Sequence, residues 1–226
     1  MKKLFGVLNL LLVLLVFAGG VYYDRHGTLS VKATASSLFV LLGAVNFAYA
    51  LLRRAGRGYS AVMLAGLVFA MAGDVLLGRS FKLGAGMFAA GHVLYFVSYC
   101  CVEKLKCRDM LIGLVIAAVS VLLLHFGKMF RFRSAIRKEI CMEYAAVISL
   151  MVGKAIGNFA GRRTAARALM AVGSAMFFFS DLMLALRMFG SAPRLAGSLC
   201  LLTYYPAQAL LAYAVYHEVN KRAEIV

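Results

Sequence analysis

Two aspartates lie inside long apolar stretches, where a bilayer disfavours ionised groups. Asp74 stands in segment 71–78 and Asp181 in segment 179–184, each between a small residue and a run of apolar residues. An ionisable group near the middle of a membrane helix costs about 2.5–3.5 kcal/mol on insertion scales, so each needs a partner, a water-filled cavity or a function. When two carboxyl groups lie in different surroundings, one can act as a proton donor while the other stays ionised. The pair therefore suggests general acid–base chemistry.

Further polar side chains in apolar sequence could assist the aspartates. His92, Tyr95 and Tyr99 share one helix face through their i, i+3, i+7 spacing, and Tyr204 and Gln208 share another through i, i+4. Less clearly placed polar candidates are Glu143, Lys154 and Tyr205.

The sequence gives little support for other reaction classes. None of the five cysteines belongs to a C-x-x-C pair, and the four histidines have no H-E-x-x-H or similar spacing. Neither a disulfide framework nor a zinc site is indicated, and we expect no metal or cofactor. The motifs of serine hydrolases and P-loop enzymes are also absent.

The composition indicates the solvent that surrounds these residues. Of the 226 residues, 63% are apolar and 15% are charged, whereas soluble domains carry about 45–50% and about 25%. A bilayer core of about 30 Å needs about 20 helical residues per crossing, which leaves room for about eight spans. We therefore predict an all-α, polytopic transmembrane helix bundle, with residues 1–226 as one integral membrane domain.

Eight apolar stretches can be located along the chain. They fall at residues 4–22, 31–52, 59–78, 81–102, 110–127, 140–157, 165–189 and 196–216, with Arg, Lys, Gly or Pro in the breaks. The first stretch also has features of a signal peptide, but it lacks a clear A-x-A site. We expect it to remain as the first helix.

The two aspartates hold similar places in the third and seventh of these helices. Four crossings separate the two helices, so both run in the same direction, and both carboxylates should lie at a similar depth. This pattern favours a four-plus-four parallel repeat that brings the two acids toward one cavity near the midplane.

The net charge of +16 does not point to nucleic acid, because nearly all of it lies in the breaks between spans. With a cytoplasmic N-terminus, fourteen Lys and Arg residues lie on the cytoplasmic side and eleven on the other. Five of those eleven lie in segment 128–138 alone. We predict that both termini are cytoplasmic, with this segment as the exception to the charge rule.

Purely structural roles would explain the same residues. Asp74 could pair at the interface with Arg79 or Lys82, and Asp181 could pair with Arg187. His92 could be a hydrogen-bonded core histidine. The glycines at 153, 157 and 161 form a close-packing surface and imply no chemistry.

Several segments together resemble one family. Gly73-Asp74-Val75-Leu76-Leu77, followed by Gly91-His92-Val93-Leu94-Tyr95, resembles one signature of the YhhN-type lysoplasmalogenases. Segment 173–181 is similar to a second signature, and Tyr204-Tyr205-Pro206-Ala207-Gln208 is similar to the family's Tyr-x-x-Ala-Gln pattern. Tyr144 and Met151 also fit, and the likeness covers about residues 30 to 215. Lys32-Ala33 stands where the family pattern has Lys-Pro, which puts the role of Lys32 in doubt.

The resemblance implies an eight-helix hydrolase that cleaves the vinyl ether bond of a lysoplasmalogen to a fatty aldehyde and a glycerophospho-alcohol. Asp74 and Asp181 would be the catalytic pair. Their neighbours, in hydrogen bonding or substrate binding, would be His92, Tyr95, Ser180, Tyr205, Gln208, Lys32 and Tyr144. The partners would be a lysophospholipid substrate and membrane lipid, in a bacterial cytoplasmic membrane or in the endoplasmic reticulum of a eukaryote.

Two alternatives remain open at this stage. A small transporter or membrane scaffold could use buried acids to bind protons or ions, and parallel repeats suit it equally well. A metal-dependent, ceramidase-like lipid hydrolase is less favoured, because three metal-ligating histidines at one depth are not evident. An enzyme should have a closed-ended lipid pocket, and a transporter should have a path across both leaflets.

Overall fold

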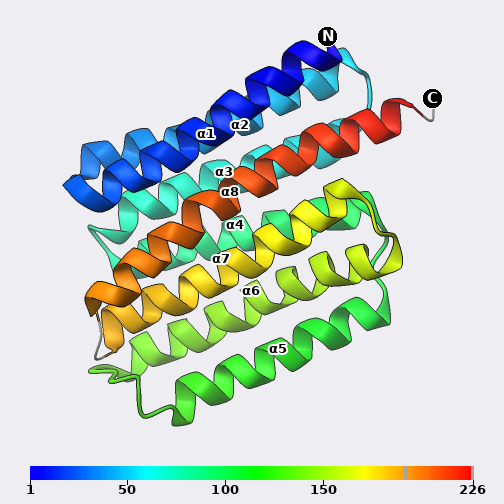
Figure 1. The fold of residues 1–226 in the computed structure, drawn as a ribbon. Coiled ribbons are helices and arrows are strands. Elements are labelled where there is room, and N and C mark those ends of the chain that lie inside the picture. The colour runs from blue at the N-terminus through cyan, green and yellow to red at the C-terminus, as the bar shows by residue number, and fades with distance from the viewer. Residues whose placement is uncertain (191–192, 225–226) are drawn as a thin grey trace.

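A computed structural model describes residues 1–190 and 193–224 of the chain. These residues form eight helices and no strand (Figure 1). The helices are α1 (Lys2–His26), α2 (Leu29–Leu52), α3 (Arg57–Leu77), α4 (Phe81–Val102), α5 (Cys107–Phe126), α6 (Ala135–Gly161), α7 (Ala165–Phe189) and α8 (Pro193–Ala223). All eight are long and apolar enough to cross a membrane. The predicted all-α transmembrane bundle is confirmed.

The helices form an up-and-down bundle in which neighbours along the chain pack side by side, except that α4 packs on α6 rather than on α5. The closest pairs are α7 with α8, α3 with α4, and α5 with α6. Helix α8 also packs on α1, α2 and α3, which places it inside the bundle, whereas α5 lies at one edge and closely approaches only α6 (Figure 1). The two ends of the chain lie on one side, where Lys2 and Glu224 form an ion pair at 2.8 Å.

Local capping fixes where the helices that carry the polar residues begin. The side chains of Thr28, Ser80 and Thr164 accept hydrogen bonds from the first turns of α2, α4 and α7. A capping oxygen of this kind satisfies one of the free N–H groups of a helix start. At the end of α1, Gly27 adopts a left-handed conformation with φ of 67°, which glycine allows without strain.

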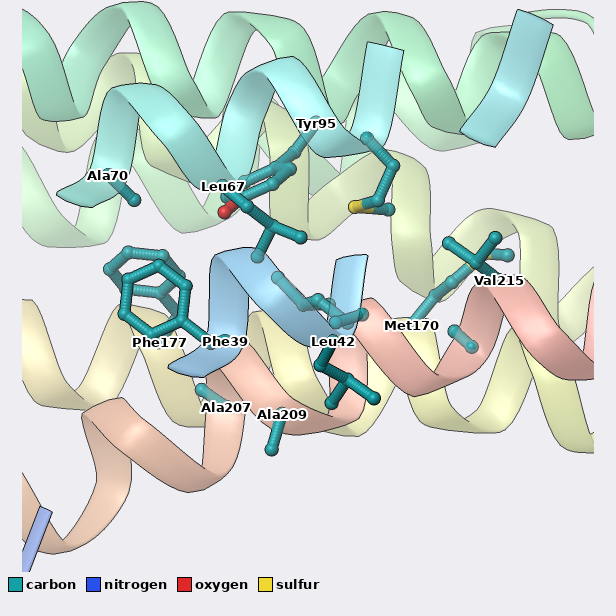
Figure 2. Close-up of a cluster of buried hydrophobic side chains, with 14 of the residues drawn as sticks. Phe39, Leu42, Leu67, Ala70, Tyr95, Met170, Phe177, Ala207, Ala209 and Val215 are labelled. Carbon is teal, nitrogen blue, oxygen red and sulfur yellow. The ribbon is translucent and has the colours of Figure 1, made fainter. Parts of the chain in front are cut away.

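The core fills the space between α2, α3, α4, α7 and α8. In Figure 2, Phe39 and Leu42 of α2, Leu67 of α3 and Phe177 of α7 belong to one cluster of buried side chains. Glycines allow the helices to approach closely. A Cβ at Gly66 would lie 2.5 Å from the Tyr95 ring, so any larger residue would push α3 away from α4.

Small residues and a buried ion pair attach α5 to α6. A side chain at Gly153 would collide with the backbone of Gly113, and one at Gly157 would collide with Asp109, so the predicted close-packing surface is present at these two positions. Lys154 and Asp109 form a fully buried ion pair at 2.8 Å. Lys154 is therefore held near the start of α5, at the bundle end that carries the chain termini.

Two helices extend well beyond the apolar stretches that mark them in the sequence. Helix α6 begins at Ala135 rather than residue 140, and α8 runs from Pro193 to Ala223 rather than from 196 to 216. The extra turns of α8 are polar but paired: Asn220 accepts from Tyr49 at 2.6 Å, and Arg222 donates to Glu218 at 2.8 Å. Hydrophobicity alone does not detect such turns.

The loop between α4 and α5 is tied to the bundle by charge. Glu103 contacts Lys106 and Arg167. The hydrogen bond from Lys106, aided by the charge of Arg167, lowers the pKa of Glu103 below its ordinary value against the effect of partial burial. Asn158 joins this end by donating to the carbonyl oxygen of Tyr99.

Candidate active site

Asp74 lies near the end of α3 and is enclosed by partners from α2 and α8. Its Oδ2 accepts hydrogen bonds from Ser36 at 2.6 Å and from Tyr204 at 2.7 Å. Its Oδ1 lies 3.1 Å from the ammonium of Lys32. The Asp74 side chain is only 4% exposed. An ammonium and two hydroxyl donors therefore satisfy this buried carboxyl group inside the bundle.

Asp181 lies at the matching place in α7 and has a different set of partners. Tyr144 of α6 donates to Oδ2 at 2.6 Å, and Nε2 of His92 in α4 lies 3.2 Å from the same oxygen. His92 Nε2 also lies 2.7 Å from the Tyr144 hydroxyl, and the His92 ring is fully buried. No lysine or arginine forms an ion pair with Asp181 among the described residues. A phenol and an imidazole therefore contact this carboxyl group, whereas an ammonium accompanies Asp74.

The two aspartate environments are related as a four-plus-four repeat predicts. Asp74 receives partners from the preceding helix, α2, and from α8, the fourth helix of the other half. Asp181 receives partners from α6 and from α4, the helices at the same places in the repeat. The two halves differ in the packing of their first helices, α1 and α5. Helix α1 packs on α8, but α5 makes no equally close approach to α4.

An apolar cavity of about 390 Å³ occupies the space between α5 and the helices α4, α6 and α7. Asp181 is the one charged residue among its lining residues, and Tyr144 lines it too. Val115 and Val119 of α5 also line the cavity although they are 57% and 62% exposed. The cavity lies between α4 and α5, which do not pack on each other, so it opens sideways toward lipid along the gap between these two membrane spans.

An aromatic layer separates Asp74 from this cavity. The Phe88 ring lines the cavity, and it packs edge-on against Tyr204 and Phe177 with ring centroids 6.1 and 6.5 Å away. Asp74 itself is not among the lining residues. The prediction that both carboxylates face one cavity is wrong for this cavity, because Lys32 and Ser36 hold Asp74 toward α2.

A sequence model described as the YhhN family matches residues 28–215. The chain belongs to the YhhN family. The match covers most of the chain, and it confirms the family that the motifs resemble. No curated protein and no solved structure matched the chain.

Four residues predicted to assist the aspartates form other contacts in this YhhN protein. Tyr95 donates to the side-chain oxygen of Gln208 at 2.8 Å, so these two contact each other rather than a carboxylate. Ser180 donates to the carbonyl oxygen of Cys200, because adjacent helix residues point about 100° apart and Ser180 therefore faces α8. Tyr205 packs its ring over Gly20, and its hydroxyl forms no hydrogen bond with a described residue.

Of the remaining candidate residues, some contact an aspartate and one lies at the surface. Lys32, Tyr144 and His92 contact an aspartate as expected. Glu143, in contrast, is exposed. The sequence reading missed Ser36, although it lies four residues after Lys32 and therefore on the same helix face. No ion pair joins Asp74 to Arg79 or Lys82, or Asp181 to Arg187, within the described residues.

Proposed function

We propose that this protein is a membrane-embedded hydrolase that cleaves the vinyl ether bond of lysoplasmalogens, releasing a fatty aldehyde and a glycerophospho-alcohol. One observation carries the proposal: Asp181 lies with Tyr144 on the wall of an apolar cavity that opens toward the bilayer. A single-chain lipid can enter such a cavity from the side and meet a carboxyl group there. The volume of about 390 Å³ falls within the range of small-molecule sites, about 300–1,000 Å³.

The chemistry requires a proton, a water molecule and stabilisation of a cation. The acid protonates the vinyl carbon β to the ether oxygen, and the double-bond electrons form the new C–H bond, leaving an oxocarbenium ion. Water adds to the adjacent carbon and loses a proton to the carboxylate, which gives a hemiacetal. The hemiacetal then breaks its bond to the glycerol oxygen, and the proton of its hydroxyl passes to that oxygen through the carboxyl group. The acid is regenerated, as in glycosidase acid–base chemistry.

We assign proton delivery to Asp181. Its Oδ2 accepts the hydrogen bond from Tyr144, while no described residue bonds its Oδ1, which leaves Oδ1 to carry the proton toward the cavity. After transfer, Tyr144 and His92 stabilise the carboxylate through Oδ2. The carboxylate is then in place to take a proton from the attacking water.

We assign the role of ionised partner to Asp74. The ammonium of Lys32 forms an ion pair with it, and Ser36 and Tyr204 orient it. Asp74 bonds Tyr204, whose ring packs on the cavity-lining Phe88, so the negative charge of Asp74 acts through a region of low dielectric and stabilises the positive charge that develops in the cavity. A transporter or scaffold would also contain buried acids, but it has no need for a carboxyl group directed into a lipid-facing cavity.

The test is incubation of purified protein with a lysoplasmalogen and with the matching saturated ether lysolipid, followed by detection of the aldehyde. We expect aldehyde from the vinyl ether alone, at a rate that falls in the Asp181→Asn variant. The saturated ether cannot be protonated to an oxocarbenium ion, so it serves as the chemical control. Absence of aldehyde from folded protein supplied with the vinyl ether would overturn the proposal in favour of the transporter or scaffold.

A further inference from the structure

Segment 128–138 concentrates positive charge on the face of the bundle opposite the chain termini. Its cations are Lys128, Arg131, Arg133, Arg137 and Lys138. None of them forms an ion pair with a carboxylate among the described residues, and all but Lys138 are exposed. Lys138 donates to the His125 carbonyl oxygen. The cluster lies on the side of the membrane that otherwise carries fewer Lys and Arg residues. The preference of positive charge for the cytoplasmic side therefore does not explain it.

The loop is anchored over the end of the cavity rather than free in solvent. In Phe130-Arg131-Phe132-Arg133 the aromatic rings turn inward and the two arginines turn outward. The Phe132 and Phe189 rings lie 4.7 Å apart, and the backbone N–H of Arg131 donates to the Phe189 carbonyl oxygen at 2.7 Å. Phe189 itself lines the cavity. The exposed guanidinium groups are thus held at the end of the space that Asp181 lines.

We propose that this basic segment, residues 128–138, binds the anionic phosphate head of the single-chain lipid whose tail occupies the cavity. Guanidinium groups suit this role because their planar donors match phosphate oxygens in pairs. Asp181 lies eight residues before the end of α7, which corresponds to about 12 Å of helix. A glycerophosphate and an arginine side chain together can span that distance. A lipid bound in this way places the bond next to its glycerol at Asp181.

The inference rests on the proposed function for its substrate, but binding tests it without turnover. The probe is a saturated ether lysophospholipid, which is not hydrolysed, compared with an alkylglycerol of the same chain that lacks the phosphate. Binding is measured in neutral detergent on wild type, on Arg131→Gln/Arg133→Gln, and on Arg54→Gln/Arg57→Gln. The last variant removes two cations from the opposite face.

We expect wild type to bind the lysophospholipid at least about tenfold more tightly than the alkylglycerol, since charge-assisted hydrogen bonds to phosphate are lost in the second. The Arg131→Gln/Arg133→Gln variant should lose most of this preference and keep its alkylglycerol affinity, which reports an intact cavity. The opposite-face variant should keep both. Inorganic phosphate should not displace the lysophospholipid, and displacement would reassign the site to a soluble phosphate compound.

Two results would overturn the headgroup site. In one, wild type binds the lysophospholipid and the alkylglycerol equally well. In the other, both double variants lower the preference for the lysophospholipid to the same extent, which indicates only a general attraction to a basic surface. Such a result leaves the proposed hydrolysis standing if aldehyde is still formed. If the preference for the phosphate-bearing lipid depends on Arg131 and Arg133 but no aldehyde is formed, the binding site stands and the proposed reaction is ruled out.

Discussion

The ammonium of Lys32 contacts Asp74 twice: it lies 3.1 Å from the carboxylate Oδ1 and donates to the main-chain carbonyl oxygen of the same residue at 2.9 Å. Helix α3 ends at Leu77, so the Asp74 carbonyl is one of the four that have no partner inside the helix. A cation at this helix end also interacts favourably with the helix dipole. Lys32 therefore joins α2 to α3 through both the side chain and the main chain of Asp74.

Replacement of Lys32 by methionine should destabilise the folded protein by about 3–5 kcal/mol, because it leaves the Asp74 carboxylate buried without its cation. The measurement is thermal unfolding in detergent. Lys82→Met is the matched control, since Lys82 is exposed and forms no ion pair with a described residue. Adding Asp74→Asn to Lys32→Met should restore much of the loss. If the single and double variants unfold alike, the ion pair does not stabilise this region.

Tyr144→Phe should lower turnover by about ten- to a hundredfold, because the hydroxyl that stabilises the Asp181 carboxylate is lost while the ring remains. The comparison is Tyr99→Phe, which removes a buried hydroxyl that bonds Ser174 at 2.8 Å and contacts neither aspartate. That variant should lose about 1–3 kcal/mol of stability and keep its turnover per folded molecule. Similar turnover in the two variants would argue against a role for the Tyr144 hydroxyl.

The spans and the two aspartates were predictable because each depends on local sequence. An apolar run of about 20 residues specifies a membrane helix, and an acid within it is conspicuous. The direction of each neighbouring side chain was not predictable, because it depends on helix rotation in the packed bundle. Ser180 therefore faces α8 although it adjoins Asp181. The cavity depends on the distance between α5 and α4, and no motif encodes that distance.

Filling the cavity should exclude the lipid chain without harming the fold. Ala185 lines the cavity, so Ala185→Phe should reduce turnover most for long-chain substrates and keep or raise the unfolding temperature. Val172→Phe on the same helix serves as the control, because Val172 is 52% exposed and does not line the cavity. Turnover against a series of chain lengths is the measurement. A uniform loss at every length would indicate that the chain lies elsewhere.

Both termini should lie in the cytoplasm. The Lys2–Glu224 ion pair places them on one face of the bundle. That face carries fourteen Lys and Arg residues, against six on the other when segment 128–138 is set aside. A reporter fused to the C-terminus should therefore be active as a cytoplasmic fusion. A fusion on the far side of the membrane would invert the orientation and place the cavity end near Phe189 on the cytoplasmic side.

The division of roles between the aspartates is tested by Asp→Asn changes, which keep the shape and remove the titratable proton and the charge. Asp181→Asn should lower turnover by at least about a hundredfold, as expected for loss of a general acid. Asp74→Asn should lower it by about tenfold or more, which corresponds to roughly 1.4 kcal/mol of lost electrostatic stabilisation.

The double variant should be little worse than Asp181→Asn alone, because without proton delivery no cation forms for Asp74 to stabilise. Turnover must be expressed per folded molecule, since Asp74→Asn also removes the partner of Lys32. Asp181→Asn removes no lysine or arginine partner among the described residues, so its yield and thermal stability should hold. Near-normal turnover per folded molecule in both single variants would eliminate the two-aspartate mechanism, whatever reaction the protein performs.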